Sequence, residues 1–172
     1  MRLIHLHAPQ AKGRRQALAG FAGSQDNPAG AVQLGSDLPC ATARARVAAC
    51  LAAHPMAWIV ARGPAVAVFH RVAADHLSLR IAGAVLFDPA DWVGADGTIA
   101  LGQDPLPFPS VIVGACRSEA SSVEFALAWG ASLVSRVDRT DLLGTPAVRD
   151  MILRREASLH PAAPRPALSP QP

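Results

Sequence analysis

Lysine, paired cysteines and long apolar runs are scarce in this chain, and each shortage excludes a class of protein. Lys12 is the only lysine, and the arginines are scattered along the 172 residues, with a formal net charge of +3. This distribution offers no basic stripe for nucleic acid. The arginine doublets Arg14-Arg15 and Arg154-Arg155 are interpreted as solvated helix faces rather than as phosphate-binding sites.

The cysteines and the apolar runs indicate in which cellular compartment the protein is expected. Cys40, Cys50 and Cys116 stand far apart, with no CxxC pair and no histidine at a zinc-ligand spacing. We therefore expect a reduced protein without disulfide, metal or cofactor. No stretch approaches the roughly 20 apolar residues of a membrane span, and the first residues are too polar for a signal peptide. The expectation is a cytoplasmic protein that binds neither membrane nor nucleic acid.

Short runs of Val, Ile and Leu alternate with amphipathic stretches, which is typical of βαβ units around a buried parallel sheet. With 51% hydrophobic and 17% charged residues, one domain over residues 1–159 is predicted. We expect an α/β three-layer sandwich, with a mostly parallel sheet of about six strands and helices on both faces. The expected strands are residues 2–7, 31–34, 57–62, 81–87, 110–115 and 132–137, and the expected helices are residues 12–21, 42–54, 64–76, 122–129 and 146–156.

Local signals mark several ends of these elements. Thr42 is expected to cap the helix at residues 42–54, and Gly130 is expected to end the helix at residues 122–129. Thr145 is a good cap for the helix at residues 146–156, because Pro146 suits its first position. Residues 88–109, rich in Gly, Pro and Asp, predict a long loop over the top of the sheet. Residues 160–172 are proline-rich and predict a disordered tail.

Three short motifs in the second half of the chain share a pattern with a known family. They are Asp88-Pro89-Ala90-Asp91, Pro107-Phe108-Pro109 and Ala128-Trp129-Gly130. This pattern resembles that of the small retinoblastoma-binding-protein-like serine hydrolases, a compact branch of the α/β-hydrolase fold. The resemblance covers roughly residues 57 to 137, while residues 1–56 fit only in the order of elements. It implies a Ser nucleophile in a Gly-His-Ser-Leu-Gly turn, an Asp after the fifth strand and a His after the sixth.

Carried over residue by residue, the resemblance implies a degenerate catalytic triad. The nucleophile position falls on Gly63, which has no hydroxyl but accepts a positive φ freely. The acid position falls nearest to Glu119, and the base position, counted forward from the Ala128-Trp129-Gly130 motif, falls close to Asp141. No histidine occurs between His76 and His160. A triad needs a neutral imidazole to remove the proton of the hydroxyl. The chain is therefore interpreted as an inactive relative of an esterase.

The residues beside the nucleophile position strengthen this interpretation. Pro64 stands where the fold uses the backbone N–H of the next residue to bind the oxyanion, and proline has no N–H. Loss of one such donor costs roughly 2.7 to 4 kcal/mol of transition-state stabilisation. Arg62 adds a permanent positive charge, and we hypothesise that it pairs with Glu119 or Asp141 and closes the former site.

Two other functions stay open at this point. In the first, a relocated nucleophile, Cys116 or a rim serine such as Ser118, would act with His7; a buried thiol and a loop-facing histidine are the plainer interpretation. In the second, Arg62 and the start of the following helix would bind a small anion, although Pro64 removes one donor there.

Other polar residues have plainer interpretations. Asp88 and Asp91 are expected to face the former pocket or to cap loops, Ser121 and Ser122 to cap a helix, and His70 to be a satisfied, partly buried histidine. The sequence favours a binding or scaffold role for an unknown protein partner or small ligand, and a homodimer is left open.

Overall fold

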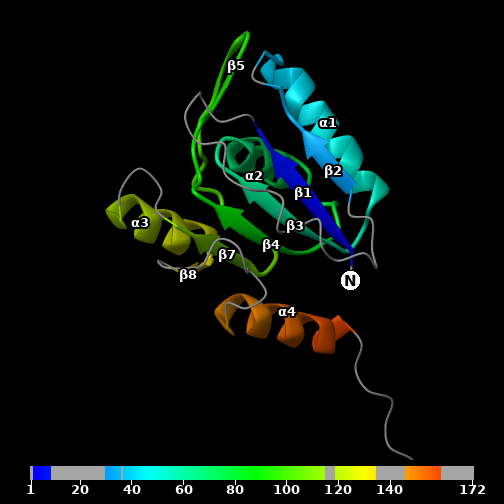
Figure 1. Ribbon diagram of the computed structural model, residues 1–172, viewed down its shortest axis with the longest axis vertical. Helices are drawn as coiled ribbons and strands as arrows, with labels where there is room; N and C mark the ends of the chain where they lie inside the picture. Colours follow the sequence, from blue (N-terminus) through cyan, green and yellow to red (C-terminus); the bar gives the residue numbers. More distant parts are fainter. Residues whose placement is uncertain (1, 9–29, 36, 115–118, 135–145, 160–172) are drawn as a thin grey trace, which may run out of the picture.

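The structure is a computed structural model that describes residues 2–8, 30–35, 37–114, 119–134 and 146–159. Six parallel strands form one sheet in the order β2-β1-β3-β4-β7-β8, and β5 and β6 form a separate antiparallel hairpin (Figure 1). The elements are β1 (Leu3–His7), β2 (Gly30–Gln33), α1 (Cys40–Ala53), β3 (Ala57–Arg62), α2 (Ala65–Asp75), β4 (Ile81–Phe87), β5 (Trp92–Gly94), β6 (Gly97–Ile99), β7 (Ser110–Val113), α3 (Glu119–Trp129), β8 (Ser132–Val134) and α4 (Pro146–Leu159).

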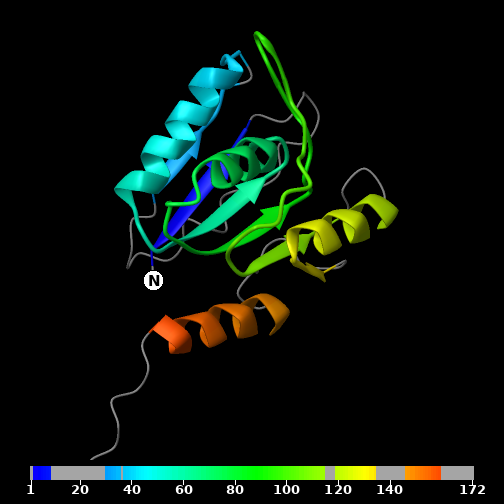
Figure 2. The same cartoon turned by 180° about the vertical axis from the view of Figure 1, so that it is seen from behind.

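The described helices lie on both faces of the sheet. One core cluster joins α1, α2 and α3 to the sheet through side chains such as Val47, Phe69 and Trp129, and the other joins α4 to it through Val148 and Ile152. Figures 1 and 2 show α4 standing apart from the other three helices. The central strands β3 and β4 are buried along almost their whole length, since helices cover them on both sides. The expected α/β sandwich with a parallel sheet is confirmed.

The strands and helices agree with the prediction best where the chain is most buried. Residues 57–62 and 81–87 are strands over the predicted range, Pro146 opens α4, and Gly130 has a φ of 64° directly after α3. The expected helix at residues 12–21 and the expected tail at residues 160–172 lie outside the described residues.

Three local expectations were wrong. Helix α1 begins at Cys40 rather than after Thr42, because the carboxylate of Asp96 accepts the N–H of Cys40 at 2.6 Å. Ser121 and Ser122 do not precede α3 but lie inside it, since the helix begins at Glu119. Part of the expected loop 88–109 is the β5–β6 hairpin.

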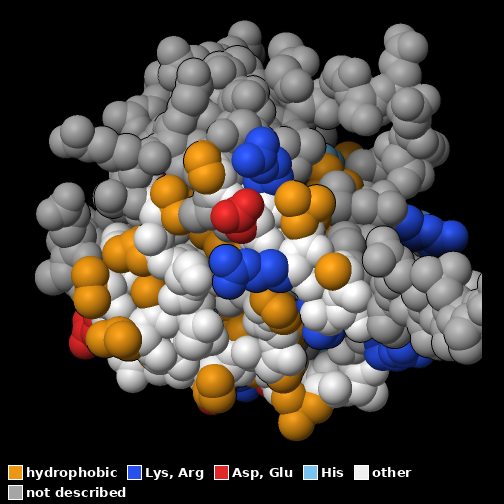
Figure 3. Space-filling view, turned by 90° about the horizontal axis from the view of Figure 1, so that it is seen from below, with side chains coloured by type: hydrophobic (Ala, Val, Ile, Leu, Met, Phe, Trp, Pro, Cys, Tyr) orange, Lys and Arg blue, Asp and Glu red, His pale blue; other side chains and the backbone are white. Residues whose placement is uncertain are grey.

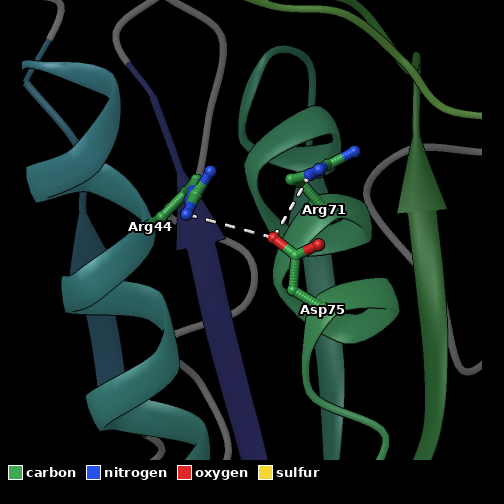
Figure 4. A network of polar contacts seen from close by, with 3 residues as sticks. All are labelled: Arg44, Arg71 and Asp75. Atoms are coloured by element: carbon green, nitrogen blue, oxygen red, sulfur yellow. Dashed lines mark hydrogen bonds and ion pairs between the residues drawn. The ribbon is translucent and has the colours of Figure 1, made fainter.

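Helices α1 and α2 are also joined at their surface by a small charged network. The Asp75 carboxylate lies 3.2 Å from Nε of Arg71 on its own helix and 4.0 Å from a guanidinium nitrogen of Arg44 on α1 (Figure 4). All three side chains are about a third to a half exposed, so the network adds at most about 1 kcal/mol to stability. Apolar packing therefore holds the two helices together.

His70 fixes the segment that follows the hairpin. Its ring is 1% exposed, stacks on Trp129 at a centroid distance of 4.7 Å, and places Nε2 2.8 Å from the carbonyl of Asp104. The indole N–H of Trp129 donates to the carbonyl of Gly102 at 2.8 Å. A satisfied histidine was expected here, but a partly buried one, and the structure buries it almost completely. Its role is to help hold residues 102–104 against α2 and α3.

Candidate functional site

Three neighbouring strands end at the carboxyl edge of the sheet with a residue of positive φ. Gly63 follows β3 with a φ of 57°, Asp88 follows β4 with 43°, and Gly114 follows β7 with 89°. Their N–H groups donate, in that order, to the last carbonyl of the next strand, at Phe87, Val113 and Val134. Each residue therefore extends the hydrogen-bond ladder by one step and then turns the chain away from the sheet. In parallel α/β sheets, ligands bind at this edge.

The turn after β3 has the form of a nucleophile elbow, a sharp passage from strand to helix. Gly63 is buried, and its carbonyl accepts the N–H of Val66 at 3.1 Å and that of Ala90 at 3.3 Å. Pro64 has helical angles, with φ −61° and ψ −24°, and its carbonyl accepts the N–H of Ala67. The turn thus has the backbone of a nucleophile elbow. Gly63 has no hydroxyl, and Pro64, the next residue, has no N–H.

Asp88 was expected to face the former pocket or to cap a loop, but its backbone conformation was not predicted from the sequence. A non-glycine residue at φ 43° is uncommon, although Asp tolerates this region better than most residues. Its carboxylate lies against the backbone of Gly114, so closely that a side chain at that position would collide with it. Backbone strain of this kind is a marker of functional sites. The sequence feature that could have indicated this conformation is an Asp directly after a buried central strand.

Arg62 and His7 form part of a row across the sheet. His7 on β1 is in register with Arg62 on β3, and Arg62 is in register with Phe87 on β4. The guanidinium carbon of Arg62 lies 5.0 Å from the centre of the Phe87 ring, at a cation–π distance. Phe87 belongs to the core cluster that faces α4. This contact holds the Arg62 side chain to the α4 side of the sheet.

Asp91 lies at the base of the β5–β6 hairpin, which follows this edge in the chain. The Asp91 carboxylate accepts the N–H of Leu101 at 3.0 Å, which closes the base of the hairpin. At the hairpin tip, Asp96 accepts the N–H of Cys40, and the N–H of Ala95 donates to the carbonyl of Leu38 at 3.3 Å. The hairpin is therefore attached to the start of α1, as both ribbon views show (Figures 1 and 2).

Several predicted site residues lie outside the described residues. These are Cys116, Ser118 and Asp141, and of Glu119 only the backbone position at the start of α3 is described. The pairing of Arg62 with Glu119 or Asp141, and the Cys116–His7 dyad, therefore stay predictions. Of the predicted residues that are described, Gly63, Pro64, Arg62, His7 and Asp88 all lie at the carboxyl edge of the sheet.

The described residues contain no group of three or more His, Cys, Asp or Glu side chains placed to hold a metal ion. Cys40 and Cys50 are free thiols. Among the described helices, none has the length and apolar character needed to cross a membrane.

Comparison with known proteins adds one finding about the fold. No family model matches the chain, and no protein with curated annotation is similar to it in sequence. The structure is similar to that of a protein from Pectobacterium atrosepticum described as a YdeN-like hydrolase, with a TM-score of 0.56 and 13% sequence identity. The similarity covers 78% of this chain and 76% of the other. The chain therefore shares its α/β fold with that protein.

Proposed function

We propose that this protein is a catalytically inactive relative of the α/β hydrolases, which binds a protein partner or a small ligand at the carboxyl edge of its sheet. The observation that carries the proposal is the turn at Gly63. It keeps the strand-turn-helix backbone of a nucleophile elbow, with a φ of 57° at the apex. The residue that would attack a substrate has no side chain there.

The chemistry that remains at the turn supports binding rather than acyl transfer. A nucleophilic serine needs a hydroxyl, a neutral imidazole and two oxyanion donors. Gly63 removes the hydroxyl and Pro64 removes one donor. Arg62 and Asp88 offer both signs of charge at this edge, with His7 beside Arg62, and such groups orient a bound molecule without bond formation.

Chemical labelling tests this proposal. Intact-protein mass spectrometry after treatment with a fluorophosphonate probe is expected to show no covalent adduct, because Gly63 has no hydroxyl at the position of the nucleophile. A stoichiometric adduct that Ser118→Ala abolishes would overturn the proposal and favour a relocated serine nucleophile.

The thiol alternative needs a separate measurement, because Cys40 and Cys50 will also react with iodoacetamide. Peptide mapping gives the alkylation rate of Cys116 alone. We expect an ordinary, slow rate that His7→Gln leaves unchanged, with His5→Gln as the matched control on the same strand. A fast rate that falls only in His7→Gln would reveal an activated thiolate and contradict the proposal.

A further inference from the structure

A second site lies at the opposite edge of the sheet, under α4. An open cavity of about 490 Å³ is lined there by Pro109, Ser132, Asp150, Met151, Arg154, Arg155 and Ser158. Pro109 immediately precedes β7 and Ser132 opens β8, so the cavity lies at the amino ends of these strands. The Gly63 turn lies at their carboxyl edge. The two sites are therefore separate.

Arg154 and Arg155 both line this cavity. This doublet was interpreted from the sequence as part of a solvated helix face. Nε of Arg155 donates to the carbonyl of Ala82 on β4 at 3.2 Å, and the side chain is half-buried. Ala82 is the second residue of β4, so this bond ties α4 to the amino end of a central strand. The bond anchors the guanidinium through Nε, and its two terminal nitrogens form no hydrogen bond or ion pair with another described residue.

The charge around the cavity is not balanced within the described residues. Neither Arg154 nor Arg155 forms an ion pair with a described carboxylate, and Asp150 is the one acidic side chain described in the lining. Ser132 and Ser158 add hydroxyl groups, and the Ser158 hydroxyl donates to the carbonyl of Arg154 at 2.8 Å. Figure 3, seen from below, shows arginine side chains gathered around a smaller acidic area on this face.

We propose that this cavity binds a small molecule that carries a phosphate group. Two adjacent guanidinium groups match the geometry of phosphate oxygens, and serine hydroxyls donate to the same oxygens. The cavity volume lies within the range of about 300 to 1,000 Å³ that is usual for small-molecule sites. Asp150 accepts a hydroxyl or amine of the rest of the molecule, and Met151 and Pro109 supply apolar contact. The proposal does not rest on the function assigned to the Gly63 edge.

Calorimetric titration of the full chain with inorganic phosphate tests the proposal, at constant ionic strength maintained with chloride. We expect saturable binding to one site, weakened about tenfold in Arg154→Gln because one charged hydrogen-bonding partner is lost. Arg149→Gln is the matched control, since Arg149 is exposed on α4 but does not line the cavity. Arg154 is exposed, so its substitution leaves the core and the Arg155 anchor intact.

Two results would overturn the inference. One is no binding of phosphate beyond that of an equal ionic strength of chloride. The other is equal weakening in Arg149→Gln and Arg154→Gln, which would mean that phosphate responds to the overall charge of α4 rather than to the cavity. Thermal unfolding of each variant without phosphate confirms that the fold is retained.

Discussion

At the carboxyl edge of the sheet, the identity of single residues decides both the backbone and the chemistry. Gly63, Asp88 and Gly114 all take positive φ values, where a β-carbon is disfavoured. Glycine accepts this conformation at no steric cost, and Asp accepts it better than most residues. Glycine at position 63 avoids backbone strain in the turn, but it also lacks the hydroxyl that a serine hydrolase would use.

Two glycines of positive φ provide a measurable contrast. A β-carbon on Gly130, with φ 64°, meets no atom within 4 Å, whereas one on Gly114, with φ 89°, collides with the Asp88 carboxylate. Gly130→Ala is expected to lower the free energy of unfolding by roughly 1 kcal/mol. Gly114→Ala should cost more, because Asp88 must move as well. Urea unfolding measures both. An equal or larger loss in Gly130→Ala would contradict the contact between Asp88 and Gly114.

The titration of His70 predicts a pH dependence of stability. Burial lowers the pKa of His70, and the nearby carbonyl and carboxylate of Asp104 oppose this only in part. The unfolded chain therefore binds more protons than the folded protein below about pH 6.5. Stability is fully present above that pH and falls as the pH drops toward the folded pKa.

Unfolding in urea at pH 7.5 and pH 5.5 measures this effect. The wild type should lose stability at the lower pH, and His70→Gln should lose less, whatever its stability at pH 7.5. Burial also lowers the pKa of His5, so some acid sensitivity will persist in the variant. An acid-induced loss of the same size in His70→Gln and in the wild type would show that His70 does not contribute.

At the scale of elements, the β5–β6 hairpin and α1 depend on each other. The first helical residue, Cys40, has its N–H bound by Asp96, 56 residues further along the chain. This hydrogen bond also lowers the pKa of Asp96. The hairpin thus supplies the side-chain acceptor that an N-cap residue such as Thr42 was expected to provide.

Substitution of Asp96 tests this dependence. In Asp96→Ala, amide exchange at Cys40 should become faster, because the N–H loses its acceptor. Asp96→Asn, which keeps a carbonyl oxygen at the same place, should show a smaller change. Hydrogen–deuterium exchange followed by mass spectrometry measures both variants, with the helix α2 peptides as an internal control. Unchanged exchange at the start of α1 in Asp96→Ala would exclude the capping role.

The same elements show which parts of the fold can be predicted from the sequence. β3 and β4 match their predicted ranges because both are buried apolar runs with clear ends. The hairpin was missed because its strands have only three residues each, although Asp96-Gly97 is a strong hairpin-turn signal. The start of α1 could not be predicted, because its cap comes from a distant loop.

At the scale of the whole molecule, the six-stranded sheet places the Gly63 turn near the middle of its carboxyl edge. β1 lies on one side of β3 and β4 on the other, so His7 and Asp88 flank the turn as strand order predicts. Sequence could indicate this edge, because the carboxyl ends of parallel strands meet there. It could not indicate the φ of Asp88, the contact of Arg62 with Phe87 or the cavity under α4, since all three depend on contacts between distant segments.

We propose that this fold has lost acyl-transfer chemistry at more than one position. The most direct test of this proposal is the rate of p-nitrophenyl acetate hydrolysis by Gly63→Ser, measured beside Gly63→Ala and the wild type. We expect the same background rate in all three, because a serine at position 63 still lacks the N–H that Pro64 removes, and Asp141 stands near the position where the resemblance implies the catalytic histidine. Clear turnover in Gly63→Ser that is absent in Gly63→Ala would contradict the account.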